Sequence, residues 1–350
     1  MSRDAPAYRV SMRQGAAVWR GFEYRDPVAV LPHWDIDSQL HWFLTATFEG
    51  ECRAVGFAER RTITEDQARW PGIPVANWTT TMDGPQYRAA VVRTRECIAA
   101  GDVYQANICR LLKAPLPQGA ELRGLWRALD RHHPAPYCGF IDIPAGEFEL
   151  LPQGLGIVSA SPELFLRRNG RTLLTAPIKG TASTAAQMLP KDRAENLMIV
   201  DLMRNDLASI CEAGTVTVPK LFALEEHPGL VHLVSYVQGR VPDDFNWCQV
   251  QEHLLPPGSV SGAPKSSAVR IISELEGAAR GHYCGTFGIA HADNAELAVG
   301  IRSFFRDGEW LQFGTGAGIT WGSDPQGEWL ETELKASRLL AIAADTWGTA

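Results

Sequence analysis

The chain of 350 residues lacks the features that mark several large protein classes. No segment approaches the ~20 consecutive apolar residues of a membrane helix, and the N-terminal residues lack the apolar core of a signal peptide. Positive charge is scarce, because 33 lysines and arginines face 40 aspartates and glutamates and no basic run stands out. The attraction to phosphate on which nucleic-acid binders depend is therefore missing. We expect a cytoplasmic protein with no membrane and no nucleic-acid partner.

Motifs for several kinds of chemistry are missing as well. The seven cysteines are scattered, with no Cys-x-x-Cys pair and no zinc-type cluster, so we expect reduced and mostly buried thiols. The sequence also lacks the glycine-rich motifs of nucleotide-binding proteins, the helical zinc-protease motif and the nucleophile elbow of serine hydrolases. These three functions therefore have no local support.

What the sequence does contain is a mixture of hairpin and helix signals. Hairpins are predicted at three places, namely 41–57 and the turns Asn169-Gly170 and Asp307-Gly308. Apolar spacing and capping residues predict three helices, namely 192–210 with Gly214 as a possible cap, 261–281 and 327–344. Hairpins interleaved with long helices indicate an α+β protein.

The first glycine hairpin carries a candidate acid and a candidate amine. With Asn169-Gly170 as its turn, Glu163 faces Ala176, and Lys179 follows three residues later. A carboxylate and an amine within reach of each other suit acid–base and nucleophilic chemistry. Strict alternation places the two side chains on opposite faces unless Pro177 interrupts the pairing. The spacing is equally compatible with an ordinary strand-end glutamate and a solvated lysine.

The second hairpin offers a candidate anion receptor. With Asp307-Gly308 as its turn, Arg302 pairs with Phe313, beside a glycine-rich loop predicted at 314–318. A guanidinium next to exposed backbone amides can bind a carboxylate. The alternative is a hairpin arginine beside a turn that needs glycine for its positive φ.

Acidic residues recur at helical spacing in two of the predicted helices. Asp192 and Glu195 share one helix face, and Glu328 and Glu331 repeat that spacing. Carboxylates on two facing helices would suit Mg²⁺, which takes one or two of them and completes its shell with water and an anionic substrate. The alternative is that acids favour the first turn of a helix, and that Glu331 pairs with Lys335.

These residues lie in segments that resemble the chorismate-utilising enzymes (anthranilate synthase component I-like), and most closely the aminodeoxychorismate synthase component I branch. The matching segments cover about 82–340 and are Gly101-Asp-Val-Tyr-Gln-Ala-Asn107, Ser161-Pro-Glu-Leu-Phe165, Pro177-Ile-Lys-Gly-Thr181, 191–206, His232-Leu-Val-Ser235, Pro257-Gly-Ser-Val-Ser-Gly-Ala-Pro-Lys265, Gly300-Ile-Arg302, Gly316-Ala-Gly-Ile319 and Glu328-Trp-Leu-Glu-Thr332. The resemblance implies a layered α+β fold with large antiparallel sheets, flanked by helices, around a deep cleft.

The resemblance also implies a set of binding residues. Chorismate's ring carboxylate would bind Mg²⁺ held by Glu195 and Glu331, with Glu328 and Asp192 holding ordered waters. The substrate's other groups would meet a further set, namely Arg302, Tyr283, the amides of Gly316, Ala317 and Gly318, Gln105 and Thr181. In relatives that add water at C2, a lysine base stands where this chain has Gln105. The glutamine therefore argues against hydration at C2 in this chain.

The catalytic residues implied by the resemblance are Lys179, Glu163 and His232. Glu163 matches the general acid that protonates the departing C4 hydroxyl, and His232 matches a histidine that lines the site. Relatives that add a nucleophile at C2 usually carry alanine where this chain has Lys179. The resemblance therefore implies that Lys179 attacks C2, that ammonia then replaces it by attack at C4, and that the product is 4-amino-4-deoxychorismate, a precursor of 4-aminobenzoate and folate.

Two organisational expectations complete the interpretation. Residues 1–80 would be a shortened β-rich part packed on a chorismate-binding catalytic domain at 81–345, which puts the tryptophan pocket of larger members in doubt. The segment 182–190 also looks shortened. Ammonia would come from a separate glutaminase subunit or from free ammonium. Ortho amination, giving anthranilate or 2-amino-2-deoxyisochorismate, and a non-catalytic chorismate-binding subunit remain as alternatives.

Overall fold

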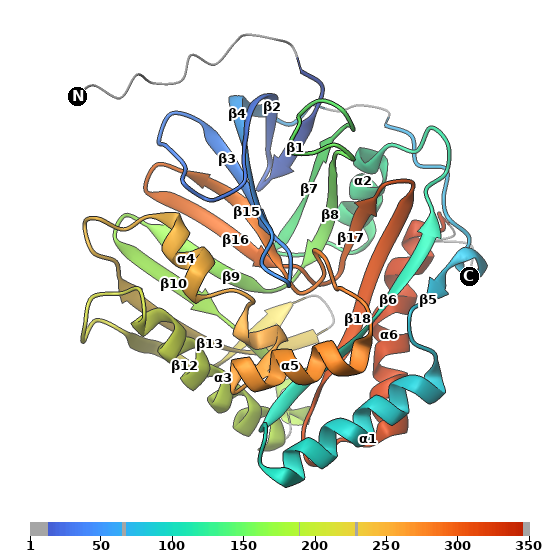
Figure 1. Cartoon of the computed structure of the whole chain (residues 1–350), viewed down its shortest axis with the longest axis vertical. Helices are drawn as coiled ribbons and strands as arrows, with labels where there is room; N and C mark the ends of the chain where they lie inside the picture. The colour runs from blue at the N-terminus through green and yellow to red at the C-terminus, as the bar shows by residue number, and fades with distance from the viewer. Residues whose placement is uncertain (1–12, 65–67, 189, 228–229, 346–350) are drawn as a thin grey trace.

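Antiparallel pairing connects the strands of this protein into one long, curled sheet (Figure 1). The computed structural model describes residues 13–64, 68–188, 190–227 and 230–345. From one edge to the other, the order is β12 (Thr217–His227), β13 (Leu230–Arg240), β10 (Thr172–Ala176), β9 (Leu164–Asn169), β16 (Asn294–Val299), β15 (Thr286–His291), β3 (His41–Ala46), β4 (Cys52–Thr62), β2 (Phe22–Leu31), β1 (Ala16–Trp19), β7 (Tyr137–Ile143), β8 (Leu155–Ser161), β17 (Ser303–Asp307), β18 (Trp310–Ile319) and β6 (Gln105–Pro115).

Short strands extend this order at both edges. β11 (Ile178–Ala182) continues from β10 along β13, while β5 (Thr79–Thr80) and β14 (Gly262–Ala263) pair with the outer edge of β6. The N-terminal strands β1–β4 thus stand in the middle of the sheet, between β15 and β7.

The helices pack on the outside of the sheet. They are α1 (Gly84–Ala100), α2 (Leu122–His132), α3 (Pro190–Ala208), α4 (Trp247–His253), α5 (Lys265–Glu276) and α6 (Pro325–Ala343), with short 3₁₀ turns η1 (Val75–Asn77), η2 (Ala185–Gln187) and η3 (Gly258–Val260). α3 contacts β11 and β13, α5 contacts β6, and α6 contacts β18. Figure 1 shows α1, α3 and α5 gathered at the end of the molecule away from β1–β4. The predicted α+β architecture of antiparallel strands and flanking helices is confirmed.

Local sequence signals explain where several helices begin and end. Asp83 and Gln86 form a capping box at the start of α1, and Gly101 ends that helix in the left-handed conformation. Gly277 ends α5 in the same way, so that helix stops before the predicted 281. α3 ends at Ala208 rather than near Gly214, which lies further on with a positive φ of its own.

Both glycine hairpins form, but their turns lie one residue later than predicted. Asn169 pairs with Thr172 and Asp307 pairs with Trp310, so glycine is the first loop residue in each case. Gly170 and Gly308 both have positive φ, whereas the residues that follow them do not. A glycine at the first central position is the requirement of a type II′ turn. Each partner therefore shifts by two residues, which keeps the same side chains on the same face.

Two large hydrophobic clusters and one small one stabilise the fold. The larger one gathers aromatic residues from the middle of the sheet, including Trp19, Phe43 and Phe287. The second lies under α2 and α6 and includes Phe304 and Phe313, whose rings are 4.9 Å apart. Burial of each such ring contributes roughly 1.5–3 kcal/mol. Across the described ranges, no helix combines the length and apolarity needed to cross a membrane.

Candidate active site

Glu163 and Lys179 converge, as the interrupted hairpin predicts. β10 ends at Ala176, Pro177 lies outside the strands, and β11 begins at Ile178 with a shifted register on β13. A further irregularity in β10 places Ala176 opposite Leu164 rather than opposite Glu163. These breaks in alternation bring the Lys179 ammonium and the Glu163 carboxylate into one cluster, where each charge acts on the other.

The cluster perturbs both titrating groups toward the neutral form. Burial raises the pKa of the Glu163 carboxyl, which the charge of Lys179 and a hydrogen bond from the Ser259 side chain partly oppose. Burial likewise lowers the pKa of the Lys179 amine, against the opposing charges of Glu163 and Glu195. Desolvation is the dominant cause in both groups. A carboxyl that can hold its proton and an amine that can lose one suit a general acid and a nucleophile.

Ser259 connects the two groups, and the sequence did not single it out. It lies buried in η3, and its carbonyl oxygen accepts hydrogen bonds from the Lys179 Nζ at 3.0 Å and from the Asn107 Nδ2 at 3.2 Å. Its side chain bonds the Glu163 carboxylate. The Glu163 Oε1 accepts no hydrogen bond from any described residue. Ser259 was found only as part of the 257–265 segment, because nothing in its type or spacing marks its role.

A second cluster forms around Arg302 and the last helix. Burial lowers the pKa of the Arg302 guanidinium, while the charges of Tyr283 and Glu331 oppose this. Burial also raises the pKa of the Tyr283 hydroxyl. Lys335 pairs with Glu331 at 2.6 Å, confirming that predicted helix pair, and donates to the carbonyl oxygen of Gly316 at 2.9 Å. Lys335 is thus a site residue that the sequence marked only as a partner of Glu331.

The glycine-rich segment is part of a strand rather than the predicted loop. Residues 314–319 belong to β18 and pair with β6, and β17 pairs with β18 only as far as Phe313. Phe313 therefore faces Phe304, and Arg302 lies before the start of β17 with a φ of 53°. Beyond Phe313, no described strand covers the other edge of β18. The amides of Gly316, Ala317 and Gly318 lie in this half-covered stretch.

Bulky neighbours explain why glycine occupies this stretch. The ring of Tyr283 lies so close to Gly314 that an added Cβ would be 2.0 Å from it. The Gln105 amide nitrogen lies 2.2 Å from the position that a Cβ of Gly318 would take. Gln105 itself is buried, and its Oε1 has no hydrogen-bond partner among the described residues. These glycines admit the two predicted substrate-binding side chains against the strand.

Cross-strand pairing joins two further predicted residues. Thr181 on β11 lies opposite His232 on β13, and the Thr181 Oγ1 is 2.9 Å from the His232 Nδ1. On α3, Asp192 packs against Gly180, which has a φ of 90° and would bring an added Cβ within 2.9 Å of the Asp192 Cβ. Both contacts are made by residues that directly follow Lys179 in the sequence.

The four predicted metal ligands lie on α3 and α6. Glu195 acts on Lys179, and Glu331 acts on Arg302. The charges of Glu328 and Glu331 both act on Tyr87. Within the described part of the chain, no three histidine, cysteine or acidic side chains are grouped closely enough to ligate one ion. The donor set consists of carboxylates, which suits Mg²⁺, and one or two of them suffice when water and an anionic substrate complete the shell.

Comparisons of the sequence agree on the family. A family model of chorismate-binding enzymes matches residues 38–341. Anthranilate synthase component 1 of Streptomyces coelicolor is 36% identical over 276 residues, which are 75% of this chain and 52% of that protein. Aminodeoxychorismate synthase component 1 of Escherichia coli is 32% identical over 332 residues, 90% of this chain and 66% of that protein. The chain thus spans about half to two thirds of these curated relatives.

Solved structures share the fold. Anthranilate synthase component I from Streptococcus pneumoniae superposes with a TM-score of 0.73 at 22% identity, covering 97% of this chain and 94% of that one. The menaquinone-specific isochorismate synthase of Escherichia coli gives 0.75 at 17% identity, with 95% and 90% covered. With its sequence match over most of its length, and with Glu163, Lys179 and Arg302 brought into adjoining clusters, this chain belongs to the family of chorismate-binding enzymes.

Proposed function

We propose that this enzyme acts as an aminodeoxychorismate synthase component I, converting chorismate and ammonia to 4-amino-4-deoxychorismate. The observation that carries the proposal is the Lys179 amine, held beside Glu163 where burial lowers its pKa. A lysine must lose its proton before it can act as a nucleophile. The named relatives include both para- and ortho-aminating enzymes, so the identity of residue 179 is what favours para amination.

The proposed reaction has two displacements. The neutral Lys179 Nζ attacks C2 of chorismate, the two conjugated ring double bonds each shift by one bond, and the C4 hydroxyl leaves as water with a proton from Glu163. Ammonia then attacks C4, both double bonds shift back, and the Lys179 nitrogen leaves C2. The net change replaces the hydroxyl at C4 by an amino group and releases one water. The raised pKa of Glu163 and the lowered pKa of Lys179 support these roles.

Substrate binding would use the residues of the second cluster. Arg302, Tyr283 and the β18 amides would hold the enolpyruvyl carboxylate, since a guanidinium and exposed amides both donate to a carboxylate. Gln105 and Thr181 would contact the ring, and His232 would line the site through its contact with Thr181.

We also propose that Mg²⁺ is the cofactor. Glu195 and Glu331 would hold it, with Glu328 and Asp192 acting through ordered water. The bound ion would supply positive charge for the ring carboxylate of chorismate. If so, removal of Mg²⁺ with EDTA abolishes turnover and its return restores it. Glu195→Gln is expected to raise the Mg²⁺ concentration needed for half-maximal activity, whereas the surface variant Glu274→Gln should not.

Nitrogen would reach the site as ammonia, from free ammonium or from a separate glutaminase subunit. The test is to incubate the purified chain with chorismate, Mg²⁺ and ammonium at mildly alkaline pH, and to identify the product by mass spectrometry. An added lyase should convert the product to 4-aminobenzoate. Anthranilate would instead indicate ortho amination, and unchanged chorismate under excess ammonium would indicate a binding subunit; either result contradicts the proposal.

A further inference from the structure

A buried ion pair lies outside the set of residues assigned to the reaction above. Glu276 is the last residue of α5, and Arg280 follows Gly277, which ends that helix in the left-handed conformation. The two side chains are 6% and 2% exposed. The Arg280 Nε and Nη2 donate to the two carboxylate oxygens of Glu276 at 2.8 Å and 2.6 Å. Because removal of two charges from water is costly, such a pair commonly adds little to stability, and another role would explain its presence.

The pair completes the outer edge of β6. β14 covers that edge only at the first two residues of the strand. Further along, the Arg280 Nη2 donates to the Asn107 carbonyl oxygen at 2.6 Å, and the Glu276 Oε1 accepts from the Cys109 nitrogen at 2.8 Å. Two charged side chains thus satisfy main-chain groups that a neighbouring strand satisfies elsewhere in the sheet. Apolar side chains of similar volume could not do this.

Arg280 also holds the segment that carries Ser259. Its Nη1 donates at 3.1 Å to the carbonyl oxygen of Val260, the next residue in η3. One guanidinium therefore connects β6 at Asn107 to η3 at Val260. The Asn107 Nδ2 makes a parallel connection, because it donates to the Ser259 carbonyl oxygen that the Lys179 Nζ also reaches. A guanidinium suits this bridge, since its planar fork donates in several fixed directions at once.

The turn between β3 and β4 restrains Arg280 in its place. The guanidinium lies 4.2 Å from the centre of the Phe48 ring. The Glu49 carboxylate accepts from the main-chain nitrogens of Arg280 and Gly281 at 2.7 Å and 3.1 Å. These contacts restrict both the main chain and the side chain of Arg280, so the bridge between β6 and η3 starts from a fixed point.

We propose that Arg280 is a positioning residue for the reaction at Lys179, and that Glu276 orients it. The pair sets the separation of β6 and η3. This separation keeps the Ser259 carbonyl oxygen on the Lys179 Nζ and the Ser259 side chain on the Glu163 carboxylate. The inference rests on the function proposed above, because it assigns the pair to that reaction.

Steady-state kinetics of the full chain carrying Arg280→Lys test the proposal. Lysine keeps the positive charge, but its donors share one nitrogen and cannot reproduce the spacing of the three guanidinium nitrogens. Formation of 4-amino-4-deoxychorismate should therefore fall about 10-fold in kcat, the equivalent of one lost hydrogen bond. KM for chorismate should change by less than about 2-fold, because Arg302 and its neighbours are untouched. The matched control is Arg270→Lys, at an exposed arginine that pairs with Glu274 on α5, and it should keep the normal kcat.

Hydrogen–deuterium exchange of the same proteins gives a readout that does not depend on turnover. Amides in 105–109 and 257–263 should exchange faster in Arg280→Lys than in the wild type, because the hydrogen bonds that hold the two segments together are weakened. Arg270→Lys should exchange like the wild type. Faster exchange in Arg280→Lys, together with a wild type that makes no 4-amino-4-deoxychorismate, would contradict the proposed function and still support the bridge between β6 and η3.

Several results would overturn the positioning role while the wild type makes the expected product. These are a normal kcat or unchanged exchange in Arg280→Lys, a loss confined to KM, and an equal loss in Arg270→Lys. Thermal unfolding shows whether each variant is folded. If Arg280→Lys is not, Glu276→Gln provides a second variant, which keeps an acceptor for the Cys109 nitrogen but removes the charge that orients Arg280. Its kcat should fall in the same way, with Glu274→Gln as the control.

Discussion

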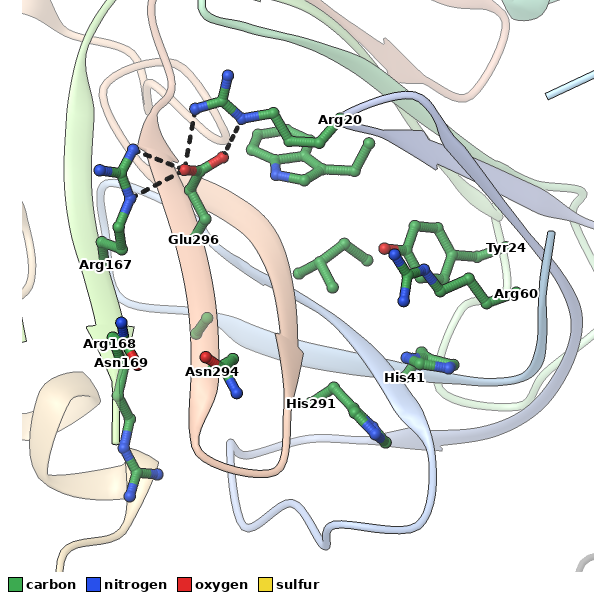
Figure 2. A pocket seen from close by; sticks show the side chains of 13 residues that line it. Arg20, Tyr24, His41, Arg60, Arg167, Arg168, Asn169, His291, Asn294 and Glu296 are labelled. Carbon is green, nitrogen blue, oxygen red and sulfur yellow. Dashed lines mark hydrogen bonds and ion pairs between the residues drawn. The ribbon is translucent and has the colours of Figure 1, made fainter. Parts of the chain in front are cut away.

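Two glutamates at opposite ends of the same pair of strands, Glu163 buried and Glu296 partly buried, show how differently one molecule can treat a carboxylate. Glu296 on β16 accepts hydrogen bonds from both Arg20 and Arg167 (Figure 2). Glu163, next to β9, has one oxygen without any described partner, and burial raises its pKa. A fully paired charge stabilises local structure, whereas an incompletely paired one is kept at a cost in stability. Such incompletely paired groups are candidates for chemistry.

The largest effect on turnover should come from removal of the Lys179 amine, which lies beside the incompletely paired Glu163. Lys179→Ala removes the proposed nucleophile, so formation of 4-amino-4-deoxychorismate should fall by about 10⁴-fold or more. The product assay with lyase coupling measures this. Lys113→Ala, which removes a lysine 3.9 Å from Asp307 on the surface, is the matched control and should keep normal turnover. Unchanged 4-amino product from Lys179→Ala would refute the covalent step.

Loss of the acid should be the next largest effect. Glu163→Gln cannot protonate the departing hydroxyl, so kcat should fall by about 10²–10⁴-fold. Chorismate binding should change much less, because the substrate carboxylates are assigned to other residues. Glu274→Gln, at an exposed glutamate paired with Arg270, is the control for the same substitution. A loss confined to KM would mean that Glu163 binds substrate rather than transfers a proton.

Neutralising substitutions at Glu163 and at Glu296 should change the free energy of unfolding in opposite directions. Glu163→Gln with Lys179→Met replaces a buried acid and a buried amine by groups that carry no charge at any pH, and should raise the free energy of unfolding by about 1–4 kcal/mol at neutral pH. Glu296→Gln removes the partner of two arginines and should lower it by about 1–3 kcal/mol. Urea unfolding measures both. Destabilisation of the double variant as large as that of Glu296→Gln would erase the distinction between the two carboxylates.

The stability gained by the double variant should depend on pH. Folding raises the pKa of Glu163 from 4.5, so the native state keeps that proton and stability falls as the pH rises through this window. Folding lowers the pKa of Lys179 from 10.5, so the unfolded chain keeps that proton and stability rises as the pH approaches 10.5. The difference between variant and wild type should therefore be greatest between the two windows and shrink toward both extremes.

The smallest expected effect is that of a substitution at Ser259, which tests whether this residue controls the pKa of Glu163. Ser259→Ala removes a hydrogen bond to the Glu163 carboxylate, so the pKa of Glu163 should rise further and kcat should fall about 10-fold. Because the acid form is the reactive one, the alkaline limb of kcat assigned to Glu163 should move to higher pH. Ser259→Thr keeps the hydroxyl and should restore both properties. A loss of activity without a shifted pH profile would reduce Ser259 to a structural residue.

The sequence predicted the elements better than their registers. Asn169-Gly170 and Asp307-Gly308 marked both hairpins, yet each turn lies one residue later, because a positive φ at either loop position is compatible with glycine. The interruption at Pro177 was predictable, since proline cannot donate to a strand ladder. The 314–318 segment was mistaken for a loop, because nothing in the sequence showed that β6 would pair with it.

The candidate site was predictable only where the resemblance supplied roles. Glu163 and Lys179 share a hairpin, so local spacing could bring them near each other. Ser259 and Lys335 reach the site from distant segments through a carbonyl oxygen and a lysine side chain. Main-chain acceptors have no sequence signature, since every residue carries one. The cavity lined by Arg20, Arg60 and Arg167 (Figure 2) could likewise not be predicted, because these arginines lie in the turn after β1, on β4 and on β9.

The ladder between β9 and β16 has a thermodynamic consequence. It runs from Asn169 opposite Asn294 to Leu164 opposite Ala298, and the Val299 nitrogen then donates to the Glu163 carbonyl oxygen at 3.0 Å. The main chain at Glu163, the proposed general acid, is thus continuous with the wall of the cavity lined by Arg20, Arg60 and Arg167. If an occupant of that cavity alters the affinity for chorismate by some factor, chorismate must alter the affinity for that occupant by the same factor.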